Sequence, residues 1–189
     1  MTPLYIDDYL SKFYNEAAFP AASLLDLSVD FEDAVNYGRF GWLVAHELSH
    51  LFDPLGYNVW TEMEDSQHYQ QISKCIENQY GTNKSIEDDF SDISGTQVGF
   101  RALKNKLGED AMKQPPVEGY RFTNEQIYFL SFANFFCQHQ PYLDKFSSST
   151  YSRDDIRALN SLKNSRDFAM AFNCNTSSPM NPSTKCTIW

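Results

Sequence analysis

Apolar residues recur every three or four positions along most of this chain, and short stretches rich in proline, glycine and serine separate the periodic segments. Side chains at this spacing share one face of an α-helix, so the pattern favours helices that bury that face. It predicts five helices, over about residues 37–52, 59–81, 85–108, 123–140 and 152–172.

Two of these segments begin with capping signals. Thr123 and Gln126 have the spacing of a capping box, and Ser152 and Asp155 repeat that spacing at the start of the last segment. Pro54 ends the first segment because proline cannot continue a helix.

The remaining segments predict little regular structure. Residues 1–14 alternate loosely between apolar and polar and fit either an edge strand or a short helix. Residues 19–25 contain Pro20 and predict a strand or an extended segment, and residues 115–122 predict a loop. The fold class that follows is mainly α with a minor β element, in a single domain over residues 1–189.

Composition and charge narrow the range of partners. The hydrophobic content of 42% and aromatic content of 15% are those of a globular protein. A net charge of −10 argues against a nucleic-acid partner and against an anionic membrane surface. No apolar run approaches the roughly 20 residues that span a bilayer, and the first residues lack the pattern of a signal peptide. We therefore expect no membrane insertion by this chain.

The four cysteines are Cys75, Cys137, Cys174 and Cys186. None forms a CxxC pair, which disfavours a cysteine zinc site. Their number leaves open either two disulfides, with three possible connectivities, or four reduced thiols.

The strongest chemical signal is the pentapeptide HELSH at residues 46–50. His46 and His50 are four residues apart and lie on one helix face, where both imidazoles can bind one zinc ion. Glu47 projects beside that point and is placed to take a proton from the water that attacks a peptide carbonyl. The pattern is typical of zinc peptidases, whereas a helix with two structural histidines is the less favoured alternative.

A catalytic zinc site needs a third protein ligand. His68 and His139 are candidates, but no histidine follows His50 at the spacing of the extended HExxHxxGxxH motif. A carboxylate from a second helix is the alternative.

The segment SIEDDFSD supplies that carboxylate. Asp88 and Asp92 are four apart and share a helix face, so one can bind zinc while the other orients a histidine. The same residues also fit a purely structural interpretation, because Ser85 and Asp88 have a capping-box spacing and acidic residues are favoured in a first helical turn.

Taken together, the motifs HELSHLFD, VWTE, EDDFSDISG and YRFTNEQIYFLSFANFFC, followed by a closing segment with MNP and C-x-x-W, are familiar. Over about residues 13–189 the chain resembles the catalytic domain of the neprilysin-like zinc metalloendopeptidases, the neprilysin and endothelin-converting enzyme type. The resemblance implies a thermolysin-like zincin fold and one bound Zn²⁺.

The resemblance also implies roles for single residues. His46 and His50 fall on zinc ligands, Glu47 on the general base, and Asp92 on the carboxylate that holds a zinc histidine. Asp88 falls on the third ligand, where the family has glutamate. Aspartate is one methylene shorter, so its oxygen is expected to fall about 1.5 Å short unless the helices lie closer. Glu87 is the less favoured substitute.

Substrate residues depart from the family in two places. The Asn-Ala pair that anchors the peptide backbone is absent ahead of FPA, and Tyr151 stands where the family has a histidine that stabilises the oxyanion. Tyr151 can donate a hydrogen bond but carries no positive charge. Arg157 matches an arginine that binds a substrate carbonyl, and an ion pair with Asp154 is the alternative role for it.

By the same resemblance Cys75 pairs with Cys186, whereas Cys137 and Cys174 match cysteines that bond to an N-terminal region. Members of the family carry a large N-terminal helical lobe and a membrane anchor, which we expect to be absent from these 189 residues. The implied location is extracellular or membrane-attached.

The function expected from the sequence is a zinc-dependent metalloendopeptidase acting on small peptides, with Glu47 as the general base. A weakened or inactive relative that serves as a binding or decoy module is the alternative, favoured by Asp88, Tyr151 and the lost Asn-Ala pair. A third interpretation is that the chain is part of a longer protein.

Overall fold

The computed structural model describes residues 8–21, 23–26, 32–54, 66–81, 84–137 and 151–189. Within these ranges it is mainly helical, with a two-stranded antiparallel sheet, which confirms the predicted fold class. The elements in chain order are β1 (Tyr9–Ser11), β2 (Glu16–Ala18), the 3₁₀-helix η1 (Ser23–Asp26), α1 (Asp33–Asn36), the π-helix η2 (Tyr37–Gly41), α2 (Trp42–Ser49), α4 (Ser66–Tyr80), α5 (Ile86–Leu107), α6 (Glu109–Met112), α7 (Asn124–Phe135), α8 (Asp154–Asn164) and α9 (Arg166–Ala171).

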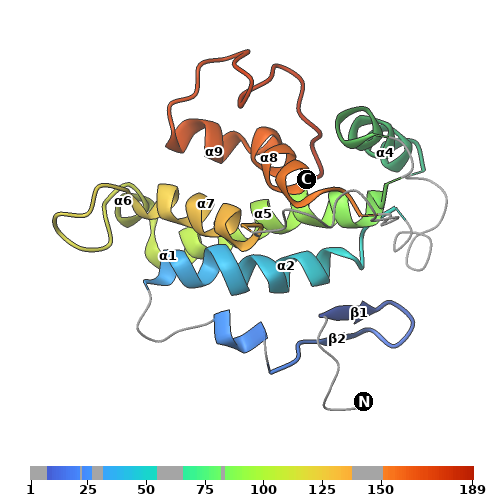
Figure 1. Ribbon diagram of the computed structural model, residues 1–189, viewed down its shortest axis with the longest axis horizontal. Helices are drawn as coiled ribbons and strands as arrows, with labels where there is room; N and C mark the ends of the chain where they lie inside the picture. The colour runs from blue at the N-terminus through green and yellow to red at the C-terminus, as the bar shows by residue number, and fades with distance from the viewer. Residues whose placement is uncertain (1–7, 22, 27–31, 55–65, 82–83, 138–150) are drawn as a thin grey trace.

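The long helix α5 lies at the centre of the molecule. It contacts α2 on one side and α4 and α8 on the other, and the β1–β2 hairpin lies beyond α2 (Figure 1). One apolar cluster lies between α5, α2, α7 and α8, and is centred on Trp42, Phe100, Tyr128 and Phe132. A second lies between α5, α4 and the C-terminal segment, around Ile76 and Phe90. Helix α5 contributes residues to both clusters and therefore connects them.

The predicted first helix is a composite. Residues 37–41 form a π-helical segment, α2 follows without a break, and regular α-helix ends at Ser49 rather than at Phe52. Gly38 lies so close to α7 that a Cβ atom there would be 2.4 Å from the carbonyl oxygen of Tyr128. The absence of a side chain at this position therefore allows η2 and α7 to pack against each other.

The hairpin shows where the sequence assigned the β element correctly and where it did not. Tyr9 pairs with Ala18 in an antiparallel register, so of the strand and the short helix left open for residues 1–14, the strand is present, over residues 9–11. For residues 19–25 the sequence left a strand or an extended segment open, and the strand is not found: the second strand ends at Ala18, and a 3₁₀-helix begins at Ser23. That helix begins where the carbonyl of Pro20 accepts a hydrogen bond from the Ser23 N–H at 3.0 Å.

The capping box predicted at Thr123 and Gln126 is confirmed. The helix it begins, α7, ends at Phe135, and residues 138–140 of the prediction lie outside the described ranges. Helix α4 is likewise described from Ser66, so the earlier part of the predicted helix 59–81 falls outside the described residues.

The last predicted helix is wrong in two respects. It divides into α8 and α9 at Ser165, whose side chain accepts a hydrogen bond from the Phe168 N–H and caps the second helix. Ser152 does not cap α8, because its hydroxyl donates to the buried carboxylate of Asp89 at 2.9 Å. Leaving the buried carboxylate of Asp89 without a hydrogen bond costs more free energy than leaving the end of α8 without a side-chain cap, so the Ser152 hydroxyl bonds Asp89.

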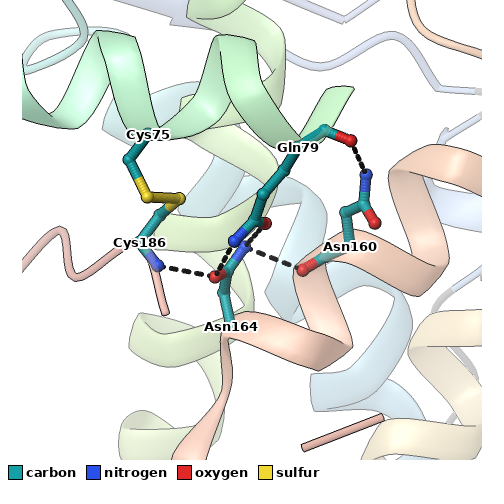
Figure 2. Close-up of a disulfide and its surroundings, with 5 residues drawn as sticks. All are labelled: Cys75, Gln79, Asn160, Asn164 and Cys186. Atoms are coloured by element: carbon teal, nitrogen blue, oxygen red, sulfur yellow. Dashed lines mark hydrogen bonds between the residues drawn. A yellow bond between two sulfur atoms is a disulfide. The ribbon is translucent and has the colours of Figure 1, made fainter. Parts of the chain in front are cut away.

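A disulfide joins Cys75 on α4 to Cys186 near the C-terminus, which confirms the predicted pairing, and Cys137 and Cys174 are free thiols. Figure 2 shows Asn164, at the end of α8, beside this disulfide. Its side-chain oxygen accepts the Cys186 N–H at 2.7 Å, and its amide donates to the side chain of Gln79 at 2.7 Å. These bonds fasten the C-terminal segment to α4 and α8.

The end of the chain also reaches the helix that carries the HELSH motif. The indole N–H of Trp189 donates to Ser94 on α5 at 2.9 Å, and the hydroxyls of Ser94 and Ser49 are 2.7 Å apart.

Among the described residues, no helix is long and apolar enough to cross a membrane.

Candidate metal centre

The centre forms where α2 crosses α5. Gly95 makes the close crossing possible, since a Cβ atom there would lie 2.9 Å from the backbone nitrogen of His46. At this crossing His46 is buried, and His50, the residue after the last turn of α2, is partly buried. Both rings point toward the first turns of α5, where Asp88 lies.

Ligand atoms of three residues converge. One atom each from His46, His50 and Asp88 lies within 4.8 Å of the others. The two Nε2 atoms are 3.3 Å apart, and Oδ1 of Asp88 is 4.0 Å from Nε2 of His46 and 3.8 Å from that of His50. Two ligands of a tetrahedral zinc are about 3.4 Å apart, because each lies about 2.1 Å from the ion. The histidine pair fits this spacing, and the aspartate oxygen lies about half an ångström farther out.

A buried carboxylate lies next to Nδ1 of His46, the ring nitrogen that does not face Asp88. Oδ1 of Asp92 is 2.9 Å from Nδ1 of His46, although the contact is too bent for an aligned hydrogen bond. Arg157 on α8 holds both oxygens of Asp92, with Nε and Nη2 at 2.6 and 2.8 Å. Burial would raise the pKa of Asp92, but the Arg157 guanidinium and His46 lower it to about 2. Asp92 therefore stays ionised and keeps the other ring nitrogen of His46, Nε2, facing Asp88.

A second buried carboxylate stands behind His50. Oδ2 of Asp53 is 2.8 Å from Nδ1 of His50, and both Asp53 oxygens accept hydrogen bonds from Lys12, at 2.7 and 2.8 Å. Burial alone would lower the pKa of His50, but the Asp53 hydrogen bond and the negative charges of Asp88, Asp53 and Glu47 raise it. Each histidine of the pair is thus held by its own aspartate.

The start of α5 fixes Asp88. Ser85 is the N-cap residue: its hydroxyl oxygen accepts the Asp88 N–H, as the capping interpretation of this segment requires. The same hydroxyl contacts Oδ2 of Asp88 and lies 3.0 Å from a carboxylate oxygen of Glu87. Capping and metal binding are therefore compatible at Asp88, because Oδ1 still faces the histidines. Glu87 is not part of the cluster formed by the described residues.

Glu47 is buried beside the histidines on α2. Burial raises its pKa, and His46 and His50 oppose that rise. A raised pKa makes this carboxylate a stronger base than an ordinary one, which suits a group that takes a proton from water.

The two residues predicted to bind substrate have different surroundings. Arg157 is partly buried, packs over the ring of Phe136 at 5.1 Å and pairs with Asp92. Tyr151 is half exposed and lies beside the start of α5, since Lys84 donates to its carbonyl at 3.1 Å and its neighbour Ser152 bonds Asp89.

Of the two alternative histidine ligands, only His68 lies within the described residues, and it is not part of the cluster. His68 is exposed on α4, where it contacts the ring of Tyr69 and not the cluster. His139 lies outside the described residues.

Comparison with known proteins agrees with this geometry. The model of peptidase family M13 matches residues 9–188, nearly the whole chain. The chain belongs to peptidase family M13. The predicted neprilysin-like resemblance is thereby confirmed.

Similar proteins are found among metalloprotease sequences and structures. The chain is 28% identical over 215 residues to Neprilysin-21 of Caenorhabditis elegans, and 29% identical over 213 residues to endothelin-converting enzyme 1 of Bos taurus. Each alignment covers 100% of this chain but 28% of the relative, so the chain spans just over a quarter of the length of these relatives. The Mycobacterium tuberculosis zinc metalloprotease Zmp1 in its open state has a TM-score of 0.80 at 21% identity, covering 100% of this chain and 34% of that one.

Two residues of this M13 chain were missed by sequence reasoning. Asp53 follows His50 by three residues in HELSHLFD, so a search for carboxylates one turn after the second histidine would have found it. Lys12 could not have been found this way, because it reaches Asp53 across 41 positions of sequence.

Proposed function

We propose that this chain is the zinc-dependent catalytic domain of a metalloendopeptidase that hydrolyses small peptides. The observation that carries the proposal is the convergence of Nε2 of His46, Nε2 of His50 and Oδ1 of Asp88, with a buried glutamate beside them. Two imidazoles and one carboxylate are a donor set typical of catalytic zinc, and three protein ligands leave a fourth position for water.

When bound, zinc supplies a Lewis acid that activates water and polarises the scissile carbonyl. Glu47 takes the proton of the attacking water and then delivers it to the leaving amine. Asp92 and Asp53 hold the two histidines, so that the ligand nitrogens keep their direction through the reaction.

Arg157 has a double role in this proposal. Its bidentate pairing with Asp92 fixes the guanidinium beside the centre, where its remaining N–H groups can donate hydrogen bonds to a substrate carbonyl. Tyr151 is the proposed hydroxyl donor to the developing oxyanion, and the Ser152–Asp89 hydrogen bond anchors its backbone next to Asp88. We also propose, from the M13 membership and the disulfide, that the domain works outside the cell or on a membrane-attached ectodomain.

The test compares the wild type with Glu47→Gln, which keeps the size of the side chain but removes the base. Both proteins are expected to bind one zinc ion by metal analysis, and only the wild type is expected to cleave a library of short peptides. Cleavage that persists in Glu47→Gln, or a wild type that binds no zinc, would contradict the proposal. A wild type that binds zinc and peptides without cleaving them would instead favour the binding or decoy module.

A further inference from the structure

Lys12 links the β-hairpin to the metal-binding helix. It directly follows β1, and β1 packs against α2 (Figure 1). Its ammonium nitrogen lies 2.8 Å from Oδ1 and 2.7 Å from Oδ2 of Asp53, so it holds both carboxylate oxygens. The side chain of Asp53 is 0% exposed and that of Lys12 is 24% exposed, which makes this a largely desolvated ion pair.

Asp53 is at the same time the partner of His50. Its Oδ2 atom, one of the two held by Lys12, lies 2.8 Å from Nδ1 of His50. The opposite ring nitrogen, Nε2, faces His46 and Asp88 at 3.3 and 3.8 Å. Lys12, Asp53 and His50 therefore form a continuous chain of contacts that ends at the ligand cluster.

We propose that Lys12 is a positioning residue for His50 and acts through Asp53. This inference rests on the proposed function, because it concerns the affinity of the same zinc site. The geometry supports this role, because the terminal torsion of a carboxylate has broad energy wells and each additional contact narrows the range over which its plane can turn. A cation that grips both oxygens fixes that plane and, with it, the direction of the imidazole.

A purely structural role is the competing explanation. In that case Lys12 would only neutralise a buried carboxylate and attach the hairpin, and its loss would lower stability without changing how zinc is bound. The two explanations differ in what they predict for metal affinity and for the geometry of the bound metal.

The experiment measures the zinc dissociation constant of the full 189-residue chain by competition with a chromogenic chelator. Lys12→Met is expected to weaken zinc binding about tenfold or more, the range typical for loss of an orienting partner. The sign of the change in zinc affinity is informative, because removing a positive charge near a cation site by itself strengthens cation binding. Weaker binding by folded Lys12→Met therefore reports that the orientation of His50 has been lost.

Two further measurements separate positioning from stability. Lys12→Arg keeps a cation that can grip both oxygens and is expected to restore most of the affinity. The visible absorption spectrum of the Co²⁺-loaded protein reports ligand geometry and is expected to change in Lys12→Met but not in Lys12→Arg.

Lys104→Met is the matched control, because Lys104 makes an ion pair of the same 2.7 Å length with Glu109, away from the site. It is expected to leave the zinc dissociation constant unchanged. Should Lys12→Met fail to fold, the double variant Lys12→Met with Asp53→Asn, which has no buried carboxylate charge at position 53, takes its place in the comparison. Against Asp53→Asn alone, adding Lys12→Met is expected to cause no further weakening of zinc binding, since Lys12 acts through Asp53 and the loss of its positive charge alone favours cation binding.

The outcomes distinguish this inference from the proposed function. A wild type that binds no zinc overturns the proposed function, and this inference falls with it. A wild type that binds zinc, together with Lys12→Met of equal or higher affinity and an unchanged Co²⁺ spectrum, overturns only the role of Lys12. Further weakening by Lys12→Met in the Asp53→Asn background overturns the route through Asp53.

Discussion

At the scale of single residues, the aspartate at position 88 decides how the metal centre is completed. Its Oδ1 atom comes within 3.8 and 4.0 Å of the two histidine nitrogens, about half an ångström beyond tetrahedral spacing. The shortfall is smaller than one methylene, because Gly95 lets α5 approach α2 closely at His46. A missing side-chain carbon is thus largely offset by the distance between two helices.

The proposed ligand role of Asp88 leads to a prediction that distinguishes it from Glu87. Asp88→Asn is expected to weaken zinc binding at least tenfold, about 1.4 kcal/mol, because the amide carries no charge to offer the ion. Glu87→Gln is the matched control and is expected to leave affinity unchanged, since the Glu87 carboxylate contacts Ser85 and lies outside the cluster. Chelator competition measures both, and the reverse order of effects would reassign the ligand.

Asp89 predicts a pH dependence of stability. Burial raises its pKa from 3.8 to about 7, against the opposing effect of the Ser152 hydroxyl. Between these two values the folded state holds a proton that the unfolded state has released, so this group lowers stability as the pH rises from about 4 to about 7. Its contribution is about 1.4 kcal/mol for each pH unit of that window.

Asp89→Asn, which does not titrate, is therefore expected to gain stability relative to the wild type across this window and to show no further gain above it. Urea unfolding of the zinc-free proteins at several pH values measures the difference. Asp110→Asn, at an exposed position, serves as the control. A difference between Asp89→Asn and the wild type that does not change with pH would contradict the prediction.

At the scale of the elements, the close crossing of α2 and α5 connects packing to metal binding. Gly95→Ala would place a Cβ atom 2.9 Å from the His46 nitrogen and 3.0 Å from its Cα atom. The helices would have to separate, at a cost of about 1–3 kcal/mol in the free energy of unfolding. Zinc affinity is expected to fall as well, because Asp88 would move away from the histidines.

Gly41→Ala is the control for that substitution, since the nearest atom to a new Cβ there is 3.4 Å away. It is expected to leave zinc affinity unchanged and to alter stability little. Urea unfolding and chelator competition on both variants provide the test. A Gly95→Ala protein with wild-type zinc affinity would show that the distance between α2 and α5 does not limit zinc binding.

Element boundaries were predictable only where local chemistry decides them. The capping box at Thr123 requires only neighbours along the chain, and the structure contains it as predicted. Ser152 has the same sequence signal, but its hydroxyl bonds Asp89, 63 positions away. The break at Ser165 was not anticipated either, because the periodic apolar pattern continues through it.

At the scale of the whole molecule, the disulfide closes the largest covalent loop of the described residues. Cys75 and Cys186 are 111 positions apart, and a loop of this length is expected to stabilise the fold by roughly 4–5 kcal/mol through the entropy of the unfolded chain. Replacing both cysteines with serine is expected to lower the free energy of unfolding by about that amount.

The paired replacement of Cys137 and Cys174, which are free thiols, is the matched control and is expected to have a much smaller effect. Urea unfolding without reductant measures both pairs. Equal losses from the two pairs would show that the effect comes from the lost side chains and not from the loop.

The sequence alone determined the mainly helical class and the zinc-peptidase motif, because both depend on short-range spacing, such as two histidines one helical turn apart. The family, and with it the pairing of Cys75 with Cys186, followed from the resemblance of several motifs and not from spacing, which left the pairing open. The tertiary structure alone decided which cations hold the carboxylates next to the histidines. Asp53 with Lys12 and Asp92 with Arg157 meet across 41 and 65 positions of sequence, and only helix packing brings them together. The same packing sets the distance from Asp88 to the histidines. The spacing of residues along the sequence does not determine the separation of two helices to a few tenths of an ångström.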